Sequence, residues 1–319
     1  MPTRWAVTDM PDQHGRIALV TGANAGIGFH EARGLASRGA HVLLASRDAT
    51  RGETARAAIM AELPAASVEL VRLDLADLDS VQQLADQVVG RHEGLDLLIN
   101  NAGVMGIPQR RTTAQGFELQ FGTNHLGHFA LTGRLLPALL RRPGSRVVTV
   151  SSLNHRMAAV KLDDLQLEHG YSPWRAYNQS KLANALFTLE LDRRLRAAQA
   201  ETLSVGAHPG YTRTELQYKG PRLGGAGLQA RALGVLTQLM AQPTAHGALP
   251  ELMAATDPQA NGGDYYGPGG FGELWGSPHK VAYTKKAHDE QLASRLWQAS
   301  QELTGVTILI PAQGAGSRP

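Results

Sequence analysis

Short, almost entirely apolar runs alternate along the chain with longer segments in which apolar residues recur at helical spacing. Strands that are apolar at nearly every position are buried on both faces, as in a parallel sheet covered by helices. Strand–helix alternation of this kind predicts an α/β fold with a doubly wound parallel sheet. The predicted strands are 16–20, 41–45, 68–73, 95–99, 145–150 and 203–207. The predicted helices are 26–38, 50–62, 78–90, 115–141 and 174–198.

The pattern loosens after residue 208, where glycine and proline crowd the stretches 219–227 and 261–278. Between these two stretches, 228–240 carries apolar residues near helical spacing: Leu228, Leu233, Leu236 and Met240. Such a stripe predicts either an apolar lid over a hydrophobic substrate or an ordinary packing face or subunit contact. The pattern alone leaves both readings open.

Nothing in the chain resembles an internal repeat or a long linker, so we predict a single domain spanning 1–319. Its parts are a core at 14–215, a substrate-loop and C-terminal elaboration at 216–305, and a loose tail at 306–319. The apolar letters VTILI at 306–310 indicate an edge strand or an oligomer contact. A homo-oligomer is therefore one expectation, which the sequence does not decide.

The composition is that of a globular protein, because 43% of the 319 residues are apolar and 18% are charged. The absence of cysteine excludes disulfides, thiolate nucleophiles and cysteine-ligated zinc. It also suits a reducing compartment, and we predict a cytoplasmic location. The first fifteen residues are polar, and no run approaches the roughly 18–20 apolar residues of a membrane span. We therefore predict neither a secretory signal nor a transmembrane segment.

The net charge is modest, at +3, although the sequence pI is about 9.3. Nucleic-acid binding requires basic residues gathered on one surface. The basic pairs here are scattered along the chain, at Arg110-Arg111, Arg141-Arg142 and Arg193-Arg194. We therefore expect a small-molecule substrate and no nucleic-acid partner.

A glycine-rich loop follows the first predicted strand and opens the first predicted helix, with the letters LVTGANAGIG at 19–28. Gly22, Gly26 and Gly28 leave room for a sharp turn and for close approach of a ligand. The helix N-terminus behind them offers free N–H groups and a positive dipole end to a pyrophosphate. Such glycines can also be plain tight turns. Their place between strand and helix favours a dinucleotide site, in which we include Asn24 and Ile27.

The end of the second predicted strand indicates which nicotinamide cofactor is bound. An acid there suits the ribose 2′-hydroxyl of NAD, and an arginine suits the 2′-phosphate of NADP. The strand runs into Ser46 and Arg47, and the following Asp48 occupies a helix N-cap position. We therefore predict that NADP(H) is preferred and that NAD(H) is possible.

Two further strands end in polar or small residues. Asn101, Ala102 and Gly103 follow 95–99, and small residues at the carboxyl end of a strand suit a site where a ring or ribose passes closely. Ser151 and Ser152 follow 145–150. Taken singly, the first group is a plausible turn and the serines are ordinary loop residues. Only their combination is specific.

Tyr177 and Lys181 are four residues apart in a segment with helical periodicity, so their side chains share one face. The pair can be a solvated surface pair. It can also be a tuned acid, because a phenol with a pKa of about 10 needs about 4 kcal/mol to reach a pKa near 7. A positive charge about 5 Å away supplies roughly 3 kcal/mol at an effective dielectric near 20. With the charge of an oxidised nicotinamide, we predict that Lys181 lowers the pKa of Tyr177 toward neutrality.

In combination and in this order, these motifs resemble the short-chain dehydrogenase/reductase family, whose members have a Rossmann fold. The resemblance covers roughly 14–215 and includes His208, Pro209 and Gly210 after the sixth predicted strand. Within the family, the segments 124–129, 151–156 and 180–187 are similar to the retinol-dehydrogenase-like branch. The separation of Ser152 and Tyr177 is longer than is usual in the family, which implies a pocket of different shape.

The resemblance implies a role for each matching residue. Tyr177 is the general acid/base, Lys181 also binds the nicotinamide ribose, and Ser152 hydrogen-bonds the reacting oxygen, with Ser151 as the alternative. Asn124 would hold a water that links Lys181 to solvent, or would satisfy backbone groups within a helix. The remaining implied cofactor contacts are Asp74, Leu75, Pro209, Gly210 and Thr212, with Thr214 as an alternative to Thr212 and a cap or turn role as an alternative for Asp74.

His125 and His128 have a spacing found among metal ligands, but no further ligand has matching spacing, so we interpret them as structural and predict no metal. Our first hypothesis is an NADP(H)-dependent oxidoreductase acting on a hydrophobic ketone, aldehyde or alcohol. The alternative is a catalytically silent NAD(P)-binding sensor or scaffold, which needs no acid/base group. A Rossmann-like methyltransferase is a third reading, and it leaves Tyr177 and Lys181 unexplained.

Overall fold

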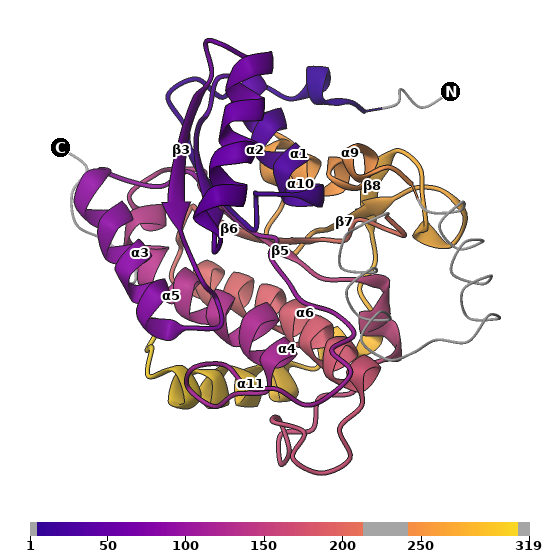
Figure 1. Cartoon of the computed structure of the whole chain (residues 1–319). Helices are drawn as coiled ribbons and strands as arrows, with labels where there is room; N and C mark the ends of the chain where they lie inside the picture. The colour runs from indigo at the N-terminus through magenta and orange to yellow at the C-terminus, as the bar shows by residue number, and fades with distance from the viewer. Residues whose placement is uncertain (1–4, 213–241, 312–319) are drawn as a thin grey trace.

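The computed structural model describes residues 5–212 and 242–311, which form one sheet with helices on both faces (Figure 1). The strand order is β3-β2-β1-β4-β5-β6-β7-β8. All neighbouring pairs are parallel except β7 and β8. The strands are β1 (Ile17–Thr21), β2 (His41–Ser46), β3 (Ser67–Arg72), β4 (Leu97–Asn100), β5 (Arg146–Val150), β6 (Leu203–Ala207), β7 (Tyr265–Pro268) and β8 (Pro278–Val281). The prediction of a doubly wound parallel sheet in a single domain is confirmed.

Alternate residues of the strands pack in two separate hydrophobic cores, because successive side chains point to opposite faces of a sheet. Leu19 and Leu43 face one layer of helices, and Val20 and Val42 face the other. The first layer contains α3 (Leu78–Arg91), α5 (Gly127–Leu140) and α6 (Pro173–Ala197). The second layer contains α1 (Gly26–Ser37), α2 (Ala49–Glu62), α9 (Thr244–Gly247) and α10 (Leu249–Thr256).

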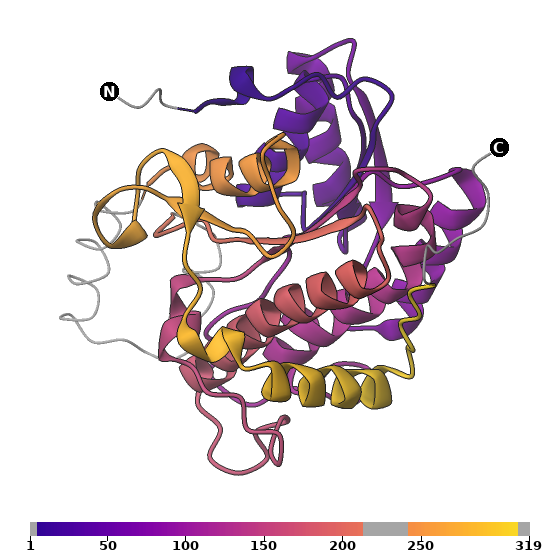
Figure 2. The ribbon, with the colours of Figure 1, turned by 180° about the vertical axis from the view of Figure 1, so that it is seen from behind.

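A further helix, α11 (Glu290–Thr304), packs outside α6 and closes a third apolar cluster (Figure 2). Asp289 caps its N-terminus by accepting a hydrogen bond from the backbone N–H of Leu292 at 2.9 Å. Trp297 of α11 lies against Phe187 of α6 with stacked rings, 5.8 Å between centroids. The C-terminal third therefore extends the sheet with β7 and β8 and covers α6, which the loosened sequence pattern did not predict.

The prediction of one continuous helix over 115–141 is wrong. Glu118 ends the preceding loop, and its carboxylate accepts hydrogen bonds from the backbone N–H groups of Gln120 and Phe121. A short α4 (Leu119–Phe121) starts there and passes through a π-helical turn, Gly122–Leu126, into α5. A π turn widens the helix by one residue and is frequent at functional sites. Here it carries Asn124.

The prediction of a loose tail from residue 306 is wrong for the part that the structure describes, 306–311. Val306 and Ile308 are buried in the core beside α5. A Cβ on Gly133 of α5 would lie within 2.8 Å of both side chains, so the glycine makes the groove that they fill. The segment 306–310 forms no strand and packs on its own chain.

Two predictions fall on residues outside the described ranges: the apolar stretch 228–240 and the alternative Thr214. Within the described ranges, no helix combines the length and the apolarity needed to cross a membrane.

Candidate active site

The candidate site lies where the strand order reverses, between β1 and β4. In doubly wound sheets, ligands bind outside the carboxyl ends of the strands at this point. The carboxyl ends of β1, β4 and β5 are Thr21, Asn100 and Val150. Helix α6 brings Tyr177 and Lys181 to the same edge, since the Lys181 ammonium donates to the backbone carbonyl of Val150 at 3.0 Å.

The glycine loop turns closely over the end of β4. Gly22 and Gly26 have positive φ angles of 68° and 60°, which L side chains rarely adopt. A Cβ on Gly28 would lie 2.5 Å from the Asn101 amide nitrogen and 2.7 Å from the Gly22 carbonyl oxygen. Helix α1 begins here with no side-chain cap at Ala25, so its first N–H groups receive no help from that residue.

The remaining loop residues support this arrangement in different ways. Ile27 is buried in the core beneath α1, whereas Asn24 is half-buried in the turn. Of these two loop residues, Ile27 therefore anchors α1 in the core, and Asn24 is partly exposed.

Thr21 ties the ends of β1 and β4 together. Its hydroxyl accepts hydrogen bonds from the backbone N–H groups of Asn101 and Ala102, at 2.9 and 3.0 Å. The Asn101 amide donates to the Thr21 carbonyl at 2.8 Å. The Thr21 hydroxyl also lies 2.9 Å from Nε2 of His128, whose Nδ1 lies 2.9 Å from the Asn124 carbonyl. Through these hydrogen bonds, Thr21 of β1 fixes the positions of Asn101 and Ala102 at the site.

Both histidines of the segment 124–129 are buried in the core. Burial lowers the pKa of His128 to about 4 and that of His125 to about 3. His125 Nε2 lies 2.9 Å from the Ser300 hydroxyl on α11. These are neutral, hydrogen-bonded positions that join α5 to β1 and α11.

Three polar residues at and just after the end of β2 have different roles. Ser46 is buried, and its hydroxyl donates to the Asp48 carbonyl at 2.9 Å. Asp48 caps α2 by accepting from the backbone N–H of Arg51 at 3.0 Å. Arg47 is exposed and forms no hydrogen bond or ion pair with any residue that the structure describes. The acid here is committed to the helix cap, while the arginine is available.

Asp74 has the turn role that the sequence analysis gave as the alternative to an adenine contact. Its carboxylate accepts from the backbone N–H of Ala76 at 3.0 Å, and its own N–H donates to the Ser80 hydroxyl at 2.9 Å. Leu75 is buried against the start of α5, where a Cβ on Gly127 would collide with it. The contact of both residues with an adenine stays a prediction.

Asn124, Gly103 and Lys181 converge at the end of β4. The Asn124 side-chain oxygen accepts from the Val104 N–H at 2.8 Å, and its amide donates to the Val104 carbonyl and the Ser180 hydroxyl at 2.9 Å. A Cβ on Gly103 would lie 3.2 Å from the Asn124 Oδ1 and 3.8 Å from the Lys181 Nζ. Asn124 therefore fixes the backbone beside Lys181, and its role in holding a water stays a prediction.

The two serines after β5 differ in their partners. Ser151 is buried, and its hydroxyl donates to the Lys181 backbone carbonyl at 2.7 Å. Ser152 forms a side-chain hydrogen bond with Tyr177 and accepts from the Asn154 N–H at 3.2 Å. The geometry favours Ser152 over Ser151 as the serine that works with Tyr177.

Without the charge of a bound nicotinamide, the protein's own groups do not bring the pKa of Tyr177 to the expected value near 7. Burial raises the pKa of Tyr177 to about 12, and the hydrogen bond with Ser152 only partly offsets this rise. Burial also lowers the pKa of Lys181 to about 8, against the opposing effect of Glu251. The Lys181 ammonium lies 5.7 Å from the Tyr177 ring centroid. Loss of solvent outweighs this distant charge, so the phenol is protonated near neutrality.

The segment after β6 is held in one conformation. Gly210 has a φ of 67°, and a Cβ there would lie 2.5 Å from the Leu274 carbonyl oxygen. The Pro209 carbonyl accepts from the Thr212 hydroxyl at 2.8 Å and from the Gln242 amide at 2.7 Å. The cofactor contacts predicted for these residues stay predictions.

Sequence reasoning missed two groups of charged residues near the site. Glu31 of α1 and Glu251 of α10 are fully buried, and neither carboxyl has a hydrogen-bond partner among the described residues. Burial raises the pKa of both, to about 8 for Glu251. Glu273 is the other addition, because its carboxylate joins His208 at 2.9 Å to Arg156 at 2.6 Å. No spacing signal could reveal contacts between residues so far apart in the chain.

The site fits a nicotinamide dinucleotide. A Cβ on Gly26 would meet nothing within 4 Å, whereas one on Gly22 or Gly28 would collide with the end of β4 or with the loop itself, so the loop keeps a bare backbone in front of the uncapped start of α1. A Cβ on Gly103 would lie 3.2 Å from the Asn124 Oδ1, so the backbone passes closely beside Asn124 and Lys181. These residues would hold the pyrophosphate at one end of the site and the nicotinamide ribose at the other.

Comparison with known proteins agrees with this geometry. A sequence model of the family described as short chain dehydrogenase matches residues 16–221. Human retinol dehydrogenase 13 is 39% identical over 302 residues, covering 92% of this chain and 85% of that protein. Mouse polyprenol dehydrogenase is 41% identical over 302 residues, covering 93% of this chain and 86% of that protein.

Solved structures show the same fold. An uncharacterized protein of Mycobacterium paratuberculosis is 41% identical and superposes with a TM-score of 0.79, over 96% of this chain and all of that one. A short chain dehydrogenase of Shigella flexneri complexed with NADP is 25% identical, with a TM-score of 0.62 over 81% of this chain and 98% of that one. With its family match, its relatives and the site at the end of β1, this chain belongs to the short chain dehydrogenase family, as an oxidoreductase acting on CH–OH groups.

Proposed function

We propose that this protein interconverts a hydrophobic ketone or aldehyde and its alcohol with NADP(H), using Tyr177 as the general acid/base. The observation that carries the proposal is the convergence of Ser152, Tyr177 and Lys181 at the carboxyl ends of β4 and β5, beside the backbone of Gly103. A bound nicotinamide supplies the hydride to the carbonyl carbon, or accepts it from the alcohol carbon.

The protein's residues handle the proton. Because the pKa of Tyr177 is about 12, its hydroxyl carries a proton near neutrality and can donate it to a carbonyl oxygen as negative charge develops there. Ser152 hydrogen-bonds the tyrosine hydroxyl, and its own hydroxyl would hydrogen-bond the same carbonyl oxygen. Lys181 places a buried cation behind both groups. In the reverse direction, the same groups would take the proton from the alcohol.

The surface around the site supports an apolar substrate. Met157, Trp174, Phe271 and Trp275 are exposed large apolar side chains: Trp174 lies in the first turn of α6, and Met157 and Phe271 lie in 3₁₀ turns. Trp174 lies edge-on to the Tyr177 ring, at 6.4 Å between centroids. The Arg156–Glu273 ion pair joins the loop of Met157 to that of Phe271. The names of the relatives, retinol and polyprenol dehydrogenase, denote long hydrocarbon alcohols.

NADP(H) is the cofactor that the end of β2 favours, since Asp48 is used as a cap and Arg47 is exposed without a partner in the described ranges. We predict that kcat/KM is higher with NADPH than with NADH. Replacing Arg47 by leucine removes a charge-assisted contact with the 2′-phosphate, which typically contributes about 1.5–3 kcal/mol. The ratio of the two kcat/KM values should therefore fall by about 10- to 100-fold. Steady-state kinetics with NADPH and with NADH measures this ratio of kcat/KM values.

Arg56→Leu is the matched control, because Arg56 lies on the same helix α2 and pairs with Glu53. It should leave the ratio unchanged. A native protein that prefers NADH, or an Arg47→Leu protein with the native ratio, would contradict this part of the proposal.

The alternative function is a silent NAD(P)-binding sensor or scaffold. The two are separated by following NADPH consumption with a panel of aliphatic and isoprenoid aldehydes and ketones. Turnover that rises with chain length supports the enzyme. Tight cofactor binding without turnover on any member of the panel supports the sensor. The cytoplasmic location and the homo-oligomer stay predictions, for which cell fractionation and sedimentation are the tests.

A further inference from the structure

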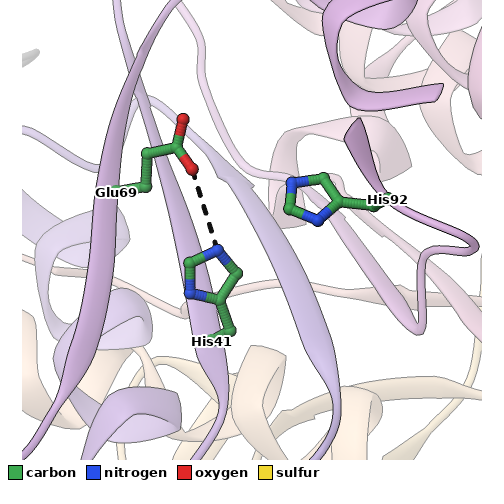
Figure 3. A group of neighbouring side chains, drawn as sticks. All are labelled: His41, Glu69 and His92. Atoms are coloured by element: carbon green, nitrogen blue, oxygen red, sulfur yellow. Dashed lines mark ion pairs between the residues drawn. The ribbon is translucent and has the colours of Figure 1, made fainter. Parts of the chain in front are cut away.

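A second group of titratable side chains lies at the edge of the sheet opposite the candidate active site. His41 is the first residue of β2, Glu69 lies in β3, and His92 directly follows the last residue of α3 (Figure 3). All three are half-buried. None of them takes part in the arrangement around Tyr177, so this group requires its own explanation.

The fold brings the three side chains together from distant parts of the chain. His41 pairs with Ser67 in the parallel register of β2 and β3, and Glu69 is two residues further on the same face. Leu43 and Val71, which continue that face, pack on the side of α3. Because α3 ends at Arg91, the next residue, His92, is placed over this corner of the sheet.

The potential ligand atoms already lie close together. One nitrogen or oxygen atom from each residue lies within 4.8 Å of the other two, and His41 Nε2 is 3.8 Å from the Glu69 Oε2. A tetrahedral zinc ion, with bonds of about 2.0–2.2 Å, requires ligand atoms about 3.3 Å apart. Binding would therefore require the three side chains to move about 0.5–1.5 Å closer, which we expect from side-chain rotation with the strands fixed.

Neighbouring residues orient two of the three ligands through their other polar atoms. His41 Nδ1 lies 2.7 Å from the Ser67 hydroxyl, which leaves Nε2 directed at Glu69. Arg91 donates to the Glu69 Oε1 at 3.0 Å, which leaves Oε2 directed at His41. Metal-binding histidines and carboxylates are characteristically held in this way through the atom that does not bind the metal. The backbone N–H of His92 donates to the Val88 carbonyl at 3.0 Å, while its imidazole makes no hydrogen bond with the residues that the structure describes.

We propose that His41, Glu69 and His92 bind one zinc ion, with water completing the coordination. Two imidazoles and one carboxylate form a ligand set that suits Zn²⁺, whereas Mg²⁺ and Ca²⁺ prefer oxygen ligands alone. The ion joins β2 and β3 to the end of α3.

The site is therefore structural and separate from the reaction. Zinc bound by the folded chain alone raises its stability by mass action. At a large excess over Kd, we expect Tm to rise by a few degrees for a chain of this length. Turnover with NADPH should be the same with and without zinc, because the ligands lie at the opposite edge of the sheet from Tyr177.

The test is calorimetric titration of zinc chloride into the full chain after treatment with a chelator. One ion per chain is expected, and Tm by scanning calorimetry should rise with the same concentration dependence. His41→Gln and His92→Gln should each weaken binding by more than about 10-fold and remove the rise in Tm. Cobalt, titrated as a probe, should give the visible absorption of a low-symmetry site in the native chain only.

His169→Gln is the matched control, since His169 is exposed and outside the group. The chain has 12 histidines, so this control separates the proposed site from adventitious binding. Variants are first compared in chelator, where an unchanged Tm shows that they are folded. The absence of stoichiometric zinc binding, or native affinity in both His41→Gln and His92→Gln, would overturn the proposal.

Discussion

Replacing Tyr177 by phenylalanine is expected to lower kcat for carbonyl reduction by about 10²- to 10⁴-fold, the usual contribution of a positioned general acid. The change removes only the hydroxyl that Ser152 holds and that is protonated near neutrality. The ring, its edge contact with Trp174 and its place one turn from Lys181 are retained. Binding of NADPH, followed by fluorescence, should therefore change by no more than a few-fold. Stopped-flow kinetics of NADPH consumption measures the loss.

Tyr266→Phe provides the control for removal of a buried tyrosine hydroxyl. Tyr266 lies in β7 and donates to the Asp257 carboxylate at 2.9 Å, at the end of α10. Loss of this hydroxyl should lower the free energy of unfolding and leave kcat within a few-fold of the native value. If the Tyr177→Phe protein turned over at nearly the native rate, another group would have to be the acid.

The second large expected effect is a change in the free energy of unfolding with pH. The buried carboxyl of Glu251 keeps its proton up to a pKa of about 8, whereas in the unfolded chain it loses the proton near the ordinary value of 4.5. Between these values the folded state binds more protons than the unfolded state, so the free energy of unfolding falls as pH rises. The slope is about 1.4 kcal/mol per pH unit for one proton. Across this window of roughly 3.5 pH units, the loss is on the order of 5 kcal/mol.

Glu251→Gln is therefore expected to be progressively more stable than the native chain as pH rises from about 5 to about 8. Glutamine keeps the shape of the side chain and carries no charge that burial would penalise. Urea unfolding at several pH values measures the difference in the free energy of unfolding. Glu302→Gln, an exposed position on α11, is the control and should follow the native curve. Parallel curves for the native and Glu251→Gln proteins would rule out a buried, protonated Glu251.

Much of the fold follows from local pattern. Most of the strands from β1 to β6 are largely apolar and buried on both faces, which predicts their place; β3, with Ser67, Glu69 and Arg72, is the exception at the edge of the sheet. The glycine loop was equally predictable, because Gly22 and Gly26 need positive φ and Gly28 needs close approach. These are constraints that single residues carry by themselves.

Other features depend on contacts that no local pattern contains. β7 lies in a stretch rich in glycine and proline and becomes a strand by pairing with β6. The helix expected over 115–141 is divided because Glu118 caps α4 and a π turn follows. The pKa of Tyr177 depended on the burial of its hydroxyl, which the spacing to Lys181 does not reveal. Glu31 and Glu251 meet only because α1 packs on α10.

The most direct test of the central claim follows the hydrogen atom itself. A hydrophobic aldehyde is incubated with the protein and with NADPH that carries deuterium at the transferable position, and the alcohol is analysed by mass spectrometry. We predict one deuterium at the former carbonyl carbon for each NADPH consumed with the native chain, and labelled alcohol forming at least about 10²-fold more slowly with Tyr177→Phe. Labelled alcohol formed equally by both proteins, or none formed by either with any aldehyde or ketone of the panel, would contradict the account.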